Sequence, residues 1–225
     1  TLTEEVTGVD LVEVQLRIAE GASLKDLDLA SPRPPRGRAL ELRVLAETLD
    51  ADGIPQPSAG TLRTFSAPTG TGIRVDTAMH EGLTAHPAFD SMIAKLIVKT
   101  EEDDPARLAR RALRALASFR IEGVATNLDF LRALLQRPEF ITEPLTTDFI
   151  AKHSAELFRA TQTLAESRDA PRTASGNGTS GSGVGLGLGS GPAATKAAQN
   201  LPPGALGRFA PFLRPVPQVV VEAGA

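Results

Sequence analysis

The residues from 39 to 47 divide into an apolar and a mostly polar set at alternating positions, and an extended strand separates two such sets onto opposite faces. The apolar face comprises Leu40, Leu42, Val44 and Ala46. The other face comprises Glu41, Arg43, Leu45 and Glu47. It holds a guanidinium between two carboxylates, a few ångströms from each along the strand. Such a fork of five donors suits the stabilisation of a planar anion, whereas the pattern alone also fits a surface strand with ordinary ion pairs.

Three further runs predict strands, at 61–65, 72–77 and 91–100, with turn residues such as Gly, Pro and Asp between them. The last run is almost continuously apolar, so it should lie in the centre of its sheet. Asp90 opens this run, and a carboxylate at that place normally needs a buried partner. We therefore expect Asp90 to make a structural hydrogen bond rather than to act in catalysis.

Helical spacing of apolar residues predicts a first helix over residues 9–20, with Thr7 as its N-cap and Gly21 as its end. Its apolar stripe comprises Val9, Val12, Leu16 and Ala19. A second helix is expected to begin at Asp103-Asp104-Pro105, where Asp can cap and Pro suits the first helical position, and further helices are expected after Asn127 and over residues 147–158. The expected fold class is α+β, an antiparallel sheet with flanking helices.

Eight of the sixteen residues from Gly176 to Gly191 are Gly, and no aromatic residue lies between Phe158 and Phe209, so this stretch cannot bury enough apolar surface to offset the entropy of ordering it. We expect a structured domain over residues 1–160, followed by a disordered Gly/Ser/Pro-rich tail over residues 161–225 that acts as a flexible linker. The stretch Gly176-Asn-Gly178-Thr-Ser-Gly181 matches a phosphate-binding glycine pattern in form. It follows no predicted strand and opens no predicted helix, so we assign it no phosphate.

The composition excludes several classes of function. A net charge of −3 and a pI near 5.7 argue against nucleic acid as a partner. No apolar stretch approaches the roughly 20 residues of a membrane span. The chain has no cysteine, so disulfides and thiolate chemistry are excluded, which fits the cytoplasm or the mitochondrial matrix. Its histidines lie in no metal-binding motif, so no metal site is expected.

A series of segments, taken in order, carries a family resemblance. They are Thr7-Gly-Val-Asp-Leu-Val12, Gln15-Leu-Arg-Ile-Ala19, Arg36-Gly-Arg-Ala-Leu-Glu-Leu-Arg43, Pro57-Ser-Ala-Gly60, Gly72-Ile-Arg-Val-Asp76, Asp90-Ser-Met-Ile-Ala-Lys-Leu96 and Gly123-Val-Ala-Thr-Asn127. In this order they resemble the C-terminal domain of the biotin carboxylase family, and the resemblance runs from Thr1 to Phe158. The string from Asp90 to Leu96, together with the Glu-Leu-Arg strand before it, is its most specific part.

The resemblance implies roles for individual residues. In the family a fixed cation stabilises the oxyanion that develops while biotin is carboxylated, and Arg43 stands at that position, with Glu41 orienting it. Thr147 falls where the family places a residue beside the adenine ring. Arg74 matches an arginine of the family's dimer interface, although Thr71 stands where an aromatic residue is usual.

The resemblance further implies the C-terminal part of an ATP-dependent biotin carboxylase within a multidomain acyl-CoA-type carboxylase. The family's nucleotide-binding domains precede this region, so ATP and Mg²⁺ should be bound mainly outside this chain, which alone should be inactive. The abrupt start at Thr1 agrees with a piece of a longer protein. Expected partners are a carrier domain that bears biotin, a carboxyltransferase domain and a second copy in a homodimer. The alternative is a non-catalytic scaffold fragment for dimerisation or carrier docking.

Overall fold

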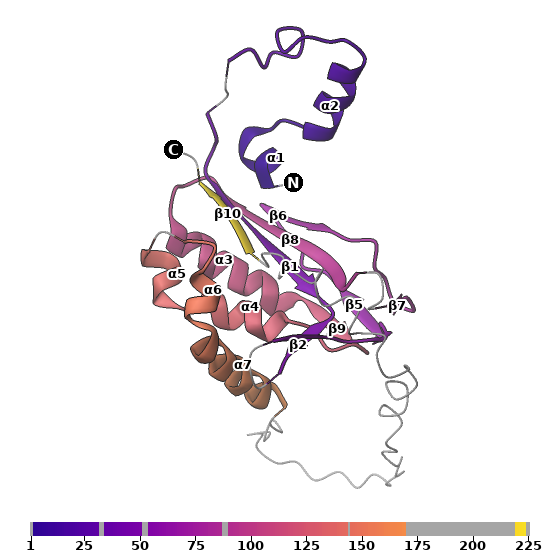
Figure 1. Ribbon diagram of the computed structural model, residues 1–225, viewed down its shortest axis with the longest axis vertical. Coiled ribbons are helices and arrows are strands. Elements are labelled where there is room, and N and C mark those ends of the chain that lie inside the picture. Colours follow the sequence, from indigo (N-terminus) through magenta and orange to yellow (C-terminus); the bar gives the residue numbers. More distant parts are fainter. Residues whose placement is uncertain are drawn as a thin grey trace, which may run out of the picture. The chain divides into compact units, whose positions relative to one another are not determined.

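A four-stranded antiparallel sheet forms the centre of the protein (Figure 1). The computed structural model describes residues 2–31, 34–50, 54–86, 90–143, 145–169 and 219–223. In spatial order the strands of the sheet are β10 (Val219–Ala223), β1 (Arg38–Leu45), β8 (Met92–Thr100) and β6 (Ile73–Asp76). The run at 91–100 thus lies in the interior of the sheet, as its apolar composition predicted.

The remaining strands form short two-stranded ladders. These pair β2 (Glu47–Leu49) with β3 (Pro55–Pro57), β4 (Gly60–Thr61) with β7 (Thr84–Ala85), and β5 (Thr64–Ser66) with β9 (Arg120–Glu122). The prediction of one strand at 61–65 was wrong, because neighbouring residues there bond to different segments. The Leu62 N–H donates to the Leu83 carbonyl at 2.9 Å, and the Arg63 N–H donates to the Glu122 carbonyl at 2.8 Å.

The helices from α3 onward lie together on one side of the sheet (Figure 1). They are α3 (Pro105–Ser118), α4 (Leu128–Leu135), α5 (Pro138–Thr142), α6 (Phe149–Lys152) and α7 (Ser154–Asp169). The core between helices and sheet includes Leu40, Leu42, Val44, Leu96, Val98, Leu108, Leu116, Leu131 and Leu135. The apolar face predicted for residues 39–47 therefore packs inward. As predicted, Asp104 caps α3 and Pro105 opens it. The helix predicted over 147–158 is divided at His153.

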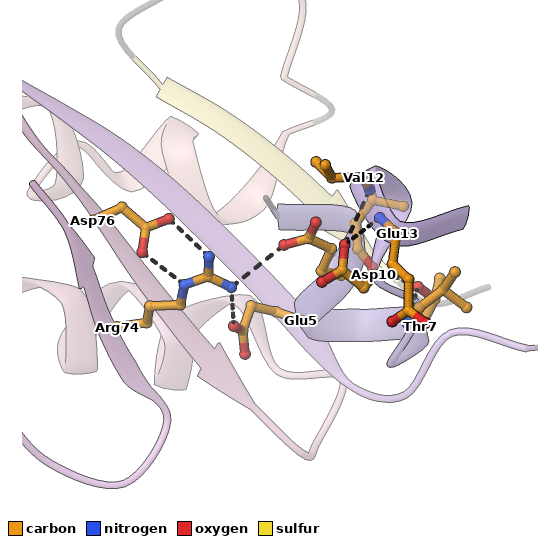
Figure 2. A network of polar contacts seen from close by, with 10 residues as sticks. Glu5, Thr7, Asp10, Val12, Glu13, Arg74 and Asp76 are labelled. Atoms are coloured by element: carbon orange, nitrogen blue, oxygen red, sulfur yellow. Dashed lines mark hydrogen bonds and ion pairs between the residues drawn. The ribbon is translucent and has the colours of Figure 1, made fainter. Parts of the chain in front are cut away.

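The first helical region differs from its prediction. It holds α1 (Leu2–Thr7) and α2 (Leu11–Ala19), and Asp10 rather than Thr7 caps α2. The Asp10 carboxylate accepts from the backbone N–H groups of Val12 at 3.0 Å and Glu13 at 2.9 Å (Figure 2). The chain turns between the helices at Gly8, whose φ of 70° suits a residue without a Cβ.

The apolar stripe predicted for this helix is present but does not join the core. Val12 is 61% exposed and Leu16 62% exposed, and α2 buries none of its residues. The shorter α1 packs instead: Leu2 and Val6 contact Ala39 of β1 and Ile97 of β8. These two strand residues alternate with core-facing neighbours, so α1 covers part of the opposite face of the sheet.

Two described elements lie within the segment for which the sequence predicted a flexible tail, 161–225. Helix α7 continues to Asp169. Strand β10 pairs with β1, from Arg38 opposite Ala223 to Leu42 opposite Val219. The intervening residues, with the glycine pattern at 176–181, lie outside the described residues.

Two motif glycines hold backbone against backbone. A Cβ built on Gly60 would lie 2.3 Å from the Gly123 carbonyl oxygen, and one on Gly123 would lie 2.0 Å from the Thr61 carbonyl oxygen. Gly123 also has a φ of 101°, where an L side chain is strained. The segment leading to Asn127 is thus fixed against the segment at Pro57–Gly60 by contacts that only glycine permits.

We predict that Gly123→Ala lowers the free energy of unfolding by about 2–4 kcal/mol, since strain and overpacking act together. Gly21→Ala is the matched control, because Gly21 has the same φ of 101° and a Cβ added there would meet no heavy atom within 4 Å. The control should cost about 1–2 kcal/mol. Urea unfolding measures both, and equal losses would show that the close approach contributes nothing.

Candidate active site

Arg43 and Glu41 lie together on the sheet face opposite helices α3 and α4. The Arg43 Nε donates to Glu41 Oε1 at 3.3 Å. The Arg43 side chain is 23% exposed and that of Glu41 is 9% exposed. Among the described residues, the terminal nitrogens of Arg43 make no hydrogen bond. The pair therefore presents a half-buried guanidinium whose Nε is held and whose outer donors remain available to an anion.

A second cation lies beside this pair. Lys95 of β8 stands directly opposite Arg43, and Asp76 of β6 stands directly opposite Lys95. Residues paired in this way extend their side chains from the same face. Among the described residues Lys95 forms no ion pair. Lys95 was not predicted as a site residue, although it interrupts an otherwise apolar strand, and that interruption was the available signal.

The predicted second carboxylate is not part of the pair. Glu47 lies in β2, beyond a register shift between Val44 and Leu45, and its Oε1 accepts a hydrogen bond from the Ser91 hydroxyl. A regular strand through residue 47 would have kept Glu47 on the Arg43 face; the irregularity at Leu45 ends that alternation.

Three motif segments converge on the chain just after Arg43. The Ala46 N–H donates to the Ser91 carbonyl at 2.7 Å, and the Ser58 N–H donates to the Ala46 carbonyl at 2.7 Å. The Asn127 side chain accepts from the Leu45 N–H at 2.9 Å. The segments of the resemblance, far apart in sequence, thus support a single stretch of β1.

The other candidate residues lie elsewhere. Asp90 is exposed, and its Oδ1 accepts from the Met92 N–H at 2.9 Å, a local bond at the start of β8. Thr147 is exposed and precedes α6, a helix that lies on the helix side of the sheet (Figure 1). No contact among the described residues joins either of them to Arg43.

Arg74 connects β6 to α1. Its guanidinium donates to both oxygens of Asp76, at 2.7 and 2.9 Å, and to Glu5 at 3.1 Å and Glu4 at 3.4 Å (Figure 2). These bonds, to Asp76 first and then to Glu5, raise the pKa of Arg74 above its ordinary value. The side chain is 42% exposed and faces outward, while Ile73 and Val75 pack on the core.

Neither a metal site nor a membrane helix is found within the described residues. No group of three or more His, Cys, Asp or Glu residues there could hold a metal ion. The His80 Nδ1 lies 2.8 Å from the Glu81 carbonyl oxygen. None of the described helices is long and apolar enough to cross a membrane.

Comparison with known proteins agrees with this arrangement. A family model described as the biotin carboxylase C-terminal domain matches residues 41–152. Pyruvate carboxylase 1 of Caenorhabditis elegans is 42% identical over 71% of this chain and 13% of its own length. The biotin carboxylase of Halalkalibacterium halodurans is 39% identical over 68% of this chain and 32% of its own length.

Solved structures give the same result. A single-chain, multi-domain long-chain acyl-CoA carboxylase matches 71% of this chain and 17% of its own, with 43% identity and a TM-score of 0.67. The biotin carboxylase domain of the Hydrogenobacter thermophilus 2-oxoglutarate carboxylase, a dimer in complex with MgADP and bicarbonate, matches 70% of this chain and 33% of its own, with 34% identity and a TM-score of 0.60. This chain spans a third or less of these four proteins. It belongs to the biotin carboxylase family and carries that family's C-terminal domain.

Proposed function

We propose that this chain is the C-terminal part of an ATP-dependent biotin carboxylase, which carboxylates carrier-bound biotin with bicarbonate. The observation that carries the proposal is the Arg43–Glu41 pair, a guanidinium anchored at Nε with its outer donors unoccupied by the described residues. Both residues lie within the segment that matches the family model. A cation fixed in this way is suited to a negative charge that appears only during reaction.

The residues of this chain fit a role as one wall of such a site. Biotin supplies a ureido group whose oxygen carries negative charge when the ring nitrogen reacts. Arg43 would donate to an oxygen of this kind, and Glu41 would keep the guanidinium plane fixed, so that little reorganisation accompanies the reaction. Lys95, across the strand pair, would add positive potential on the same face.

ATP and Mg²⁺ are proposed to bind mainly to parts of the enzyme outside this chain. The related Hydrogenobacter thermophilus domain, in complex with MgADP and bicarbonate, is about three times as long as its matched segment. We assign to this chain a position beside the adenine at Thr147, whose exposed side chain precedes α6.

We propose an acyl-CoA-type carboxylase as the assembly, with a biotinyl carrier domain and a carboxyltransferase domain as partners. The long-chain acyl-CoA carboxylase supports this choice at 43% identity, and pyruvate carboxylase 1 supports pyruvate as the competing acceptor at 42%. The cytoplasm or the mitochondrial matrix is the proposed location; human pyruvate carboxylase, a relative at 38% identity, is mitochondrial by name.

The first prediction from the proposed function concerns Arg43→Gln in the complete carboxylase. We expect biotin carboxylation to slow by about 10²–10³-fold, since one fixed donor to a developing oxyanion is lost. The melting temperature should change little, because the side chain lies on the polar face of β1. Lys at this position should rescue only in part, because it offers a point charge and no planar fork.

Arg38→Gln is the matched control. Arg38 lies on the same strand, is 24% exposed and pairs with a carboxylate, that of Asp103. Arg38 is separated from the core-facing Leu40 by two positions, so it lies on the face of β1 opposite Arg43. Its loss should therefore leave the rate of biotin carboxylation unchanged. A near-normal rate for Arg43→Gln would refute the catalytic role and favour the scaffold alternative.

The second prediction concerns the isolated chain. Purified residues 1–225 should release no ADP from ATP in response to bicarbonate, because the nucleotide-binding domains of the family are not among them. The complete enzyme, assayed alongside, provides the positive control. Turnover above background in the isolated chain would mean that it contains an ATP site of its own.

The third prediction concerns the proposed homodimer. Arg74→Glu should weaken association, and it also places another carboxylate among Glu4, Glu5 and Asp76, which would loosen α1. Glu5→Gln is therefore the control, since it loosens α1 and keeps the guanidinium. Sedimentation of the complete enzyme at sub-micromolar concentration should show a dimer for Glu5→Gln and dissociation for Arg74→Glu. Equal behaviour of the two variants would count against Arg74 as an interface residue.

A further inference from the structure

The described pairing of β1 becomes irregular along the stretch from Arg43 to Leu45. On one side the described residues of β10 pair with β1 as far as Leu42, which lies opposite Val219. On the other side the register with β8 shifts between Val44 and Leu45, so that Ile93 is left without a partner in β1. A bulge of this kind interrupts the ladder and bends the strand. The backbone groups of Arg43 and Leu45 that point away from β8 therefore require another partner, because buried peptide groups are almost always hydrogen-bonded.

Asn127 provides that partner. Its Nδ2 donates to the Arg43 carbonyl at 3.0 Å, and its Oδ1 accepts from the Leu45 N–H at 2.9 Å. Its own backbone N–H donates to the Leu45 carbonyl at 3.1 Å. The side-chain amide of Asn127 thus bonds to the backbone of β1 on both sides of Val44, as a peptide group of a neighbouring strand would.

The placement of this amide is informative because Asn127 is also the N-cap residue of α4. Asparagine at an N-cap commonly accepts a hydrogen bond from the first turn of its helix. Asn127 makes no such bond, and its side chain, 5% exposed as a residue, is turned to β1 instead. An aspartate at this position would cap the helix equally well. The two bonds to β1, however, need a donor and an acceptor in one planar group, which asparagine provides.

We propose that Asn127 is a positioning residue for Arg43. It fixes the backbone from which the Arg43 side chain extends, while Glu41 fixes Nε at the other end of that side chain. The guanidinium is then held at both ends, as a preorganised donor must be. This inference rests on the proposed function, in which Arg43 is the catalytic cation.

The test is Asn127→Asp in the complete carboxylase. The change is nearly isosteric, preserves a good N-cap and preserves the acceptor for the Leu45 N–H. It removes the donor and sets a carboxylate oxygen against the Arg43 carbonyl. We expect kcat for biotin carboxylation to fall by about 10- to 100-fold, the size of effect that a displaced catalytic group produces. The KM for ATP should be unchanged, since the proposed nucleotide contact lies on the helix side of the sheet.

A double-mutant cycle with Arg43→Gln separates positioning from general damage. If Asn127 acts through Arg43, then Asn127→Asp should slow the Arg43→Gln enzyme by less than about threefold, because the group it positions is already lost. Asp104→Asn is the control substitution at another helix cap, where the side chain only accepts, from the Arg107 N–H at 3.1 Å. This control should keep the normal rate.

The outcomes are distinct. A normal rate for Asn127→Asp, or an equal loss in both backgrounds, would overturn the positioning role while leaving Arg43 catalytic. A normal rate for Arg43→Gln itself would overturn the proposed function and, with it, this inference. If Asn127→Asp does not fold, Asn127→Ser replaces it in the same cycle, because serine is neutral and caps equally well but cannot bridge both backbone groups.

Discussion

The antiparallel pairing of β1 with β8 is the constraint on which the rest of the structure depends. Its register sends Leu40, Leu42 and Val44 into the core and leaves Arg43 on the opposite face beside Lys95. Because side chains alternate along a strand, a slip of one residue would exchange the two sets. The same hydrogen bonds that complete the sheet therefore also decide which residues are available for chemistry.

The two faces of the sheet have different tasks. The face toward α3 and α4 is apolar and continuous, so burial stabilises it. The other face packs Ala39 and Ile97 under α1 and is otherwise more polar, with Arg43 held by Glu41, and Arg74 held by the carboxylates of Asp76 and α1. Exposed ion pairs of the latter kind contribute about 0–1 kcal/mol each, so they orient side chains more than they stabilise the fold.

Much of this architecture could be predicted from the sequence where periodicity is strong. The apolar run at 91–100 correctly predicted a strand, and Asp104-Pro105 correctly predicted the start of α3. Each of these two patterns fits only one kind of element. The start of α2 was not predicted correctly, because Thr7 and Asp10 are both good caps and the turn at Gly8 decides between them. The role of Asn127 was beyond prediction, since it depends on the irregular pairing of β1 with β8 after Val44, which is a tertiary fact.

The contact between Gly60 and Gly123 has a consequence for engineering the chain. The two segments approach each other through backbone atoms, so no side-chain substitution can compensate for a change in the distance between them. The lengths of the loops that carry Gly60 and Gly123 are therefore fixed together. A reporter peptide or tag inserted near either glycine would disturb the support of Arg43. The turn at Gly21 has the same φ as Gly123, a Cβ added there would meet no heavy atom within 4 Å, and its N–H donates locally to the Ile18 carbonyl, so it is the better place for an insertion.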